Sequence, residues 1–348
     1  MTNKGLIQNF FEDFEVGRKL TCPTPRVLTD ADRVAYISFT GDRTPLYCSS
    51  AGSVHPLIVF HTVLGQTVRQ ISLNAVANLG YAEMVWHRPV RVGDEIHTTI
   101  EIIGLKENSN RQSGIVYART TGSNQHGEPV LSYCRWVMVR KNREAETSYL
   151  RDPVVPTVAP LVPTGHLAGT PPNHFSPRDT GGNFFLEDYS VGERIYHSDG
   201  QTINSSDHMS FTRLYQNSAR VHFDAITTGG KPLVYGGLII SLGYAQAFSG
   251  FENRLGIKAI NAGTHANPAY AGDTAYCFTE VLDRVSLSDL HGALRLRMFV
   301  VKNHQPDESF SPMNDSTSSN TQRYHPAVVL DLDYWELMAT RRSDAGRR

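Results

Sequence analysis

The loop from Tyr215 to His222 carries side chains suited to proton transfer. His222 is an imidazole, which can accept and return a proton near neutral pH. Asn217 lies five residues before it, and because an amide cannot act as a base, it could only orient water or the imidazole. Arg220 is the cation nearest to His222 in sequence, and its guanidinium could hold a carboxylate. This loop is therefore the first candidate for a catalytic site.

Each of these side chains also has a structural explanation. A buried histidine is often held by hydrogen bonds without taking part in chemistry, an asparagine often caps a turn, and an arginine often forms a surface salt bridge. Arg43 or Arg213 could also hold a carboxylate in place of Arg220. The sequence leaves these alternatives open.

A pair of glycines follows the loop. Tyr235 precedes Gly236 and Gly237, and an apolar run that predicts a helix comes next. Free amides at a helix start form an anion site, and glycine lets an oxygen approach the backbone closely. The pair could equally serve only to allow a tight turn.

The chain contains two copies of one unit. Residues 9–17 return as residues 183–192, and from Phe14 and Tyr189 through the candidate loops the copies stay 175 residues apart. Toward the end of each copy, where Trp136 matches Trp335, the spacing has grown to 199 residues. A repeat of this length predicts two similar domains in one chain.

The two copies differ where chemistry is expected. At the same spacing, Tyr47 takes the place of His222, and Asp42 takes the place of Asn217. This difference predicts duplication followed by division of labour. Asp42 is a candidate for a second acid-base group, although an aspartate in a Gly-Asp turn is more often structural.

Both copies have the pattern of an α+β fold. Short helices are predicted to begin at Thr29 and Asn204, which can each cap backbone amides, and each has an aspartate three residues further on. Long apolar helices are predicted at 56–77 and 237–251. Their apolar residues cover more than one face of each helix, so other elements must surround them. Strands with alternating apolar residues predict antiparallel sheets around them. The predicted fold is a double hotdog, in which two antiparallel sheets are each wrapped around a long central helix.

The predicted domains follow from this pattern. Residues 1–143 form a first hotdog that shapes the substrate pocket without catalysing, and residues 183–348 form the catalytic hotdog. Residues 144–182 are rich in proline and predict an extended linker. The second copy is longer mainly at 304–326, where Ser, Asn and Asp residues predict a surface loop.

Composition narrows the class of protein. The 348 residues are 40% hydrophobic and carry a formal net charge of −1, which supports neither nucleic-acid nor membrane binding.

The start of the chain lacks a signal-peptide pattern, so a cytoplasmic location is expected, and the four widely spaced cysteines are expected to be reduced. His55 and His61 lack partners at ligand spacing, so no metal is predicted. No nucleotide-binding or nucleophile-elbow motif is present, and no cofactor is expected.

The loops carry a resemblance to a known family. Tyr36, the Gly-Asp pair ending at Asp42, the Pro-Leu pair ending at Leu46, and His222 in the second copy resemble the motif of the MaoC-like dehydratases, the hydratase 2 group. Within that group, residues 71–83, 104–110, 127–131 and 330–335 resemble the mesaconyl-CoA hydratases, also called β-methylmalyl-CoA dehydratases.

The resemblance implies a role for each candidate. His222 would be the acid-base group, Asn217 its positioning partner, and the Gly237 amide the donor to the thioester oxygen. Substrate binding would fall to Arg220, Tyr215 and Gly236.

The implied activity is reversible, cofactor-free hydration of a branched, carboxylated 2-enoyl-CoA, with an acyl-CoA thioester as the binding partner. Three rivals stay open: an (R)-specific enoyl-CoA hydratase for fatty acyl chains, a non-catalytic acyl-CoA-binding protein, and a hotdog thioesterase. A long apolar tunnel would favour the first rival, and a short pocket ending in an arginine would favour hydration of the carboxylated substrate. A homodimer is expected, since most soluble enzymes of this kind associate with closed symmetry.

Overall fold

In a computed structural model of the protein, residues 9–48, 53–142, 152–168, 176–314 and 323–345 are described. The first half contains η1 (Phe11–Asp13), β1 (Lys19–Thr21), β2 (Arg26–Val27), α1 (Asp30–Thr40), α2 (Pro45–Cys48), α3 (Pro56–Thr67), η2 (Val68–Ser72), β3 (Ala75–Trp86), β4 (Glu95–Glu107), β5 (Ser113–Ser123) and β6 (Pro129–Arg140). The connecting segment contains η3 (Thr164–His166) and α4 (Pro177–Thr180).

The second half repeats this order. It contains η4 (Leu186–Asp188), β7 (Arg194–Thr202), α5 (Ser205–Leu214), η5 (Arg220–His222), α6 (Gly236–Gln246), β8 (Arg254–Thr264), β9 (Thr274–Ser286), β10 (His291–Lys302), the short β11 (Met313–Asn314) and β12 (Arg323–Tyr324), β13 (Val328–Ala339) and α7 (Arg341–Ala345). The α+β prediction is confirmed.

Apart from the short β11 and β12, which pair with each other, the described strands of both halves form one antiparallel sheet. Its order is β1-β4-β5-β6-β3-β8-β13-β10-β9-β7, with β2 paired to β4. The halves meet where β3 pairs with β8, for example Tyr81 with Gly263. Gly80 permits this close approach, because a Cβ there would lie 2.7 Å from the Gly263 carbonyl oxygen and 2.5 Å from the Trp136 ring. The two predicted sheets are thus joined edge to edge.

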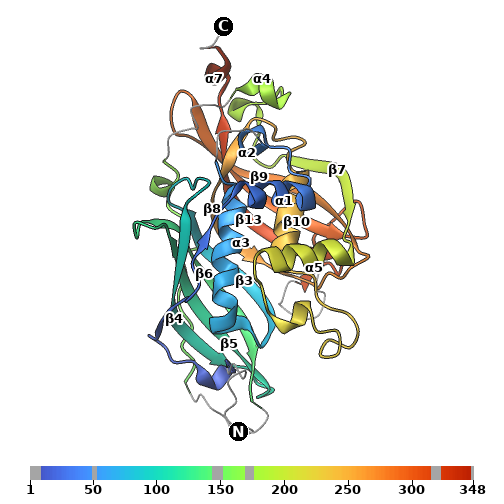
Figure 1. The fold of residues 1–348 in the computed structure, drawn as a ribbon. Helices are drawn as coiled ribbons and strands as arrows, with labels where there is room; N and C mark the ends of the chain where they lie inside the picture. The colour runs from blue at the N-terminus through green and yellow to red at the C-terminus, as the bar shows by residue number, and fades with distance from the viewer. Residues whose placement is uncertain (1–8, 49–52, 143–151, 169–175, 315–322, 346–348) are drawn as a thin grey trace.

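Each half wraps its own central helix. Helix α3 contacts β4, β5 and β6, whereas α6 contacts β7, β9, β10 and β13; Figure 1 shows α3 against the sheet and α1 next to α5. All residues from Leu57 to Thr67 and from Gly237 to Gln246 are buried, as their apolar patterns predicted. One continuous apolar core contains both helices.

The helices are shorter than the sequence pattern predicted. Helix α3 ends at Thr67 and a single π-helical turn runs to Ser72, because from Ala75 onward the chain pairs with β6 in the sheet. Helix α6 ends at Gln246 rather than at residue 251. Tertiary pairing therefore overrides the local helical pattern in the first half.

The starts of the first helix in each half differ in detail. Asp32 accepts hydrogen bonds from the Thr29 amide and hydroxyl, as a capping aspartate should. Asn204 was predicted to cap backbone amides, but its side chain donates to the Asp207 carboxylate instead. The dipole at that helix start is still matched by a negative charge.

The connecting segment crosses the outer face of the sheet. Val154 exchanges backbone hydrogen bonds with Leu105, and further along Val162 and Leu167 are buried against the second half. The Val162 amide donates to Asn261 over 2.8 Å. Residues 143–151 and 169–175 of the predicted linker lie outside the described residues.

Candidate functional site

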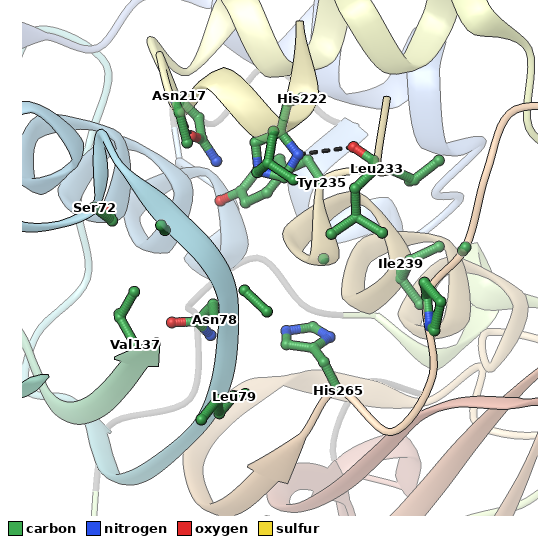
Figure 2. A pocket seen from close by; sticks show the side chains of 18 of the residues that line it. Ser72, Asn78, Leu79, Val137, Asn217, His222, Leu233, Tyr235, Ile239 and His265 are labelled. Atoms are coloured by element: carbon green, nitrogen blue, oxygen red, sulfur yellow. Dashed lines mark hydrogen bonds between the residues drawn. The ribbon is translucent and has the colours of Figure 1, made fainter. Parts of the chain in front are cut away.

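A cavity of about 280 Å³ lies between the two halves. The first half contributes Ser72, Asn78 and Arg135 to its lining, and the second half contributes Asn217, His222 and His265. Figure 2 shows His222 and Asn217 on one side and His265 and Asn78 on the other. The predicted loop and the start of the second central helix are thus brought to a single site.

His222 is fixed by a hydrogen bond to the backbone. It ends the 3-10 turn η5, is buried, and its Nδ1 lies 2.8 Å from the Leu233 carbonyl oxygen. Because a carbonyl can only accept, Nδ1 carries the proton and Nε2 keeps its lone pair. No described residue hydrogen-bonds Nε2. Burial lowers the pKa of His222 to about 4, so the ring is neutral at physiological pH and can accept a proton at Nε2.

Asn217 makes the turn-capping bond that was weighed from the sequence. Its Oδ1 accepts the Ala219 amide over 3.3 Å, which is the turn-capping bond of an asparagine. That bond fixes the amide plane and leaves Nδ2 without a partner among the described residues, and Figure 2 shows this nitrogen directed toward the cavity. Asn217 can therefore donate one hydrogen bond to a ligand or water.

The start of helix α6 borders the cavity at Gly236. A Cβ at this position would lie 2.4 Å from the His265 ring, so only glycine fits there. The first amides of a helix have no acceptor within it, and no acceptor for the Gly236 or Gly237 amide is found within the described chain. Gly237 itself does not line the cavity, and a Cβ there would meet the Tyr235 ring.

Further polar side chains lie near this helix start. His265, at the end of β8, lies with Nε2 3.4 Å from the Tyr81 hydroxyl, and burial lowers its pKa to about 4. The Tyr235 hydroxyl lies 3.1 Å from Nδ1 of His61. His61 is fully buried and its Nε2 lies 2.8 Å from the Ser241 hydroxyl, so it is held as part of the core. His265 was not predicted from the sequence.

Two of the predicted substrate-binding residues are not brought to the cavity. Arg220 is exposed, although it stands in the same turn as His222. Tyr215 is buried, and its ring packs 4.8 Å from the rings of both His61 and Phe211. Within the 3-10 turn His222 is buried and Arg220 is exposed, a difference that the linear spacing did not reveal.

The arginine that lines the cavity is Arg135. It lies on β6, is 2% exposed, and its guanidinium donates to the hydroxyls of Thr67 over 2.7 Å and Ser72 over 3.4 Å. A signal for it exists in the sequence, because Arg135 takes the apolar phase of a strand in which Leu131 and Tyr133 are also buried. A charged residue in that phase indicates a specific polar environment.

The two other arginines weighed from the sequence lie elsewhere. Arg43 is on the surface, where it donates to Ser249 over 2.9 Å and lies 3.4 Å from Asp199. Arg213 lines a second hollow of about 570 Å³ that also contains Arg69 and shares only Asn217 with the cavity.

The equivalent site in the first half is closed. Asp42 and Arg254 are both buried, with guanidinium to carboxylate distances of 3.3 and 3.4 Å. Tyr47, which takes the place of His222, lies 3.4 Å from the Leu255 carbonyl oxygen through its hydroxyl. The hollow around these residues has a cavity volume of about 0 Å³. The division of labour predicted from the repeat therefore has a structural counterpart, one open and one filled site.

Asp42 is held in its charged form. Although burial alone would raise its pKa, Arg254 and His55 keep that pKa well below the usual range of an aspartic acid. Its Oδ1 also accepts the Thr44 amide over 2.8 Å, the same turn bond that Asn217 makes. Asp42 does not line the open cavity.

Three observations concern the class of protein. Cys22, Cys48, Cys134 and Cys277 are all free. Among the described residues, no group of three or more His, Cys, Asp or Glu side chains is placed to hold a metal ion. Over the same residues, no helix has the length and hydropathy required to cross a bilayer.

Comparisons with known proteins identify the family and support the fold. The family described as mesaconyl-CoA hydratase matches residues 2–309. A mesaconyl-CoA hydratase from Cereibacter sphaeroides is 44% identical, over 97% of this chain and 99% of the relative. A β-methylmalyl-CoA dehydratase from Chloroflexus aurantiacus is 42% identical, over 98% of this chain and 99% of the relative.

Solved structures confirm the double hotdog. A putative MaoC domain protein dehydratase from Chloroflexus aurantiacus superposes with a TM-score of 0.88 at 41% identity, over 98% of this chain and 99% of that chain. A Mycobacterium tuberculosis protein with a double hotdog fold gives a TM-score of 0.71 at 23% identity, over 94% and 98% of the chains, a likeness of fold alone. By its sequence and its structure, the chain belongs to the mesaconyl-CoA hydratase family.

Proposed function

We propose that the protein catalyses the reversible hydration of mesaconyl-CoA to β-methylmalyl-CoA, acting as a carbon-oxygen lyase without a cofactor. The observation that supports it most directly is the buried His222, neutral and with a free Nε2, in a small cavity beside a helix start. Both relatives of more than 40% identity carry the name of this reaction, in one direction or the other.

The proton chemistry can be assigned to one imidazole. In hydration, Nε2 of His222 takes a proton from water as the oxygen bonds to the β-carbon, and the double-bond electrons move toward the thioester oxygen. The resulting enolate takes the same proton from Nε2 at its α-carbon. In dehydration, Nε2 removes the α-proton and returns it to the departing hydroxide. Both directions begin from the neutral imidazole.

The other groups of the site stabilise and orient the reactants. The amides of Gly236 and Gly237 have no acceptor among the described residues and stand at a helix start, where developing negative charge on the thioester oxygen is favoured. The free Nδ2 of Asn217 would donate to the water oxygen and hold it for His222. The first half would contribute the other side of the acyl pocket.

The pH dependence of hydration should reflect the lowered pKa of His222. Because burial lowers that pKa to about 4, the ring stays neutral through the range in which an ordinary histidine takes up a proton. We expect kcat/KM to stay constant from pH 8 to pH 6 and to fall only as the pH approaches 4. A steady-state profile measured with folding monitored by circular dichroism checks this, and a half-loss of activity near pH 6.5 would contradict it.

A panel of thioesters tests the proposed reaction. We expect mesaconyl-CoA to be hydrated with a kcat/KM at least about 100-fold above that of crotonyl-CoA or a longer enoyl-CoA, because the cavity is small and contains a cation. Loss of the absorbance of the conjugated thioester gives the rates. Preference for a long chain would indicate a fatty acyl hydratase, free CoA release a thioesterase, and binding without turnover a non-catalytic protein.

A homodimer and a cytoplasmic location, both expected from the sequence, stay predictions.

A further inference from the structure

Within the part of the chain that the structure describes, Arg135 is a buried cation without an anionic partner. Its side chain is 2% exposed, and its described partners are two hydroxyls, those of Thr67 and Ser72. Its Nε is buried and has no hydrogen-bond partner among the described residues. Burying a guanidinium without a counter-charge is costly, so this arrangement would be stabilised by an anion supplied from outside the chain.

The second half shows what a satisfied buried arginine is like in this fold. Arg254 has a carboxylate partner in Asp42, donates to the Thr44 hydroxyl over 2.7 Å and to the Tyr244 carbonyl over 2.7 Å, and stacks on the Tyr244 ring. Its surroundings are filled, whereas Arg135 lines an open cavity. The contrast indicates that the missing partner of Arg135 is a ligand of the cavity.

The repeat points the same way. Trp136 of β6 and Trp335 of β13 take equivalent positions in the two copies, so the equivalent of Arg135 is Tyr334. Tyr334 is fully buried beside Tyr244. At this strand position, an arginine thus lines the open cavity, and a tyrosine lies near the closed site.

Another polar side chain of the cavity also lacks a hydrogen-bond partner in the described chain. Both amide atoms of Asn78 are buried and unpaired, and this residue lines the same cavity; Figure 2 shows its amide near Val137, the next inward residue of β6. Burial raises the pKa of Tyr133 to about 12 even though Arg135 lowers it, so the phenols around the guanidinium stay neutral and provide no anion. The cavity therefore combines a fixed positive charge with unpaired amide donors.

We propose that Arg135 is the specificity-determining residue that binds the free carboxylate of the substrate, a role the sequence pattern assigned to Arg220. This inference rests on the proposed function for the identity of the substrate. In mesaconyl-CoA the carboxylate is bonded to the β-carbon, so its anchoring by Arg135 would also place that carbon for attack by the water held near His222. Neutralising the carboxylate would favour addition of an electron-rich oxygen to the same carbon.

The test compares two arginines and two ligands. Methylsuccinyl-CoA is the saturated, unreactive analogue, and its primary amide removes only the charge. In the wild type we expect the acid to bind about 100-fold more tightly than the amide. Arg135→Met should weaken binding of the acid by about 100-fold and leave the amide within 3-fold, whereas the matched control Arg220→Met, at an exposed position, should bind both as the wild type does.

Kinetics with mesaconyl-CoA and its amide separate this inference from the proposed reaction. Loss of selectivity in Arg135→Met together with retained hydration of the amide supports both. Selective binding without turnover by the wild type would contradict the proposed reaction and leave the role of Arg135 intact. Equal binding of acid and amide by the wild type would overturn the role of Arg135 even if Arg135→Met fails to fold. Arg135→Lys, which keeps the charge and loses the planar fork, should retain part of the selectivity, and a selectivity lost in Arg220→Met instead would also overturn it.

Discussion

The His222→Ala variant is expected to lose between about 100- and 10,000-fold of kcat for mesaconyl-CoA, because it removes the one imidazole nitrogen proposed to take and return the proton. The loss should appear in both directions of the reaction, since each begins at Nε2. Binding of the unreactive methylsuccinyl-CoA should change little, because His222 is not assigned to the carboxylate or the CoA moiety. Steady-state hydration and dehydration assays measure the first effect, and calorimetric titration measures the second.

His197 provides a matched control. It is also buried in the second half, its Nδ1 lies 2.7 Å from the Ser249 carbonyl oxygen, and burial lowers its pKa to about 4. It does not line the cavity. His197→Ala should therefore lower thermal stability and leave the turnover of folded protein unchanged. Full turnover in His222→Ala, or an equal loss in His197→Ala, would remove the proposed role of His222.

His265 distinguishes one imidazole from the other. It lines the same cavity, but its ring packs against Gly236 at the start of α6 rather than lying beside Asn217. If His265→Ala abolished turnover while His222→Ala kept it, the proton carrier would be His265, and Asn217 would have lost its proposed partner.

Most of the fold could be predicted from the internal repeat in the sequence. Two copies of a short helix, a long apolar helix and alternating strands predicted both hotdogs, because the apolar periodicity of each element depends on what it packs against. The pairing of β3 with β8 could not be predicted from those patterns. Each strand lies at the edge of its own half, and the sequence of an edge strand does not show whether that edge is free or paired with another strand. The early end of α3 was missed because the pairing of Ala75 with Val139 on β6 is a tertiary contact, which the helical pattern of the sequence does not reveal.

Part of the cavity lining could be predicted, namely the residues that belong to the family motif. His222, Asn217 and Gly236 line the cavity, as their spacing and the family resemblance indicated. Arg220 was chosen because it is close to His222 in sequence, but a 3-10 turn places neighbouring side chains on different sides. Arg135 lies 87 residues before His222 in the chain and reaches the cavity only because β6 lies beside β3 in the sheet.

The Asp42→Asn variant is expected to be destabilised by about 3 kcal/mol while keeping its turnover within about 3-fold. The substitution leaves Arg254 as an uncompensated charge at a site where both side chains are at most 3% exposed, and breaking one partner of such a buried pair is strongly destabilising. Activity should survive because Asp42 lies in the closed site and does not line the cavity. Urea unfolding and steady-state assays at a temperature where the variant is folded give the two values.

The exposed pair of Arg43 and Asp199, 3.4 Å apart, gives the control for Asp42. Asp199→Asn removes a carboxylate from an arginine in the same way, but on the surface, and should change stability by no more than about 0.5 kcal/mol. A large loss of kcat in Asp42→Asn without a loss of stability would identify Asp42 as the second acid-base group that the sequence left open.

The stability deficit of Asp42→Asn should also depend on pH, because Glu336 is the other acid near Arg254. Burial raises the pKa of Glu336 to about 8, and the Asp42 charge contributes to that rise. A carboxyl whose pKa is raised by folding stabilises the folded state below its unfolded pKa and loses that stabilisation as the pH rises toward the folded value. Removing the Asp42 charge lowers the pKa of Glu336, so in the variant this loss ends at a lower pH than in the wild type. The difference in unfolding free energy between wild type and variant should therefore be smaller at pH 8 than at pH 6. A difference that grows over this range would show that Glu336 does not balance the charge of Arg254.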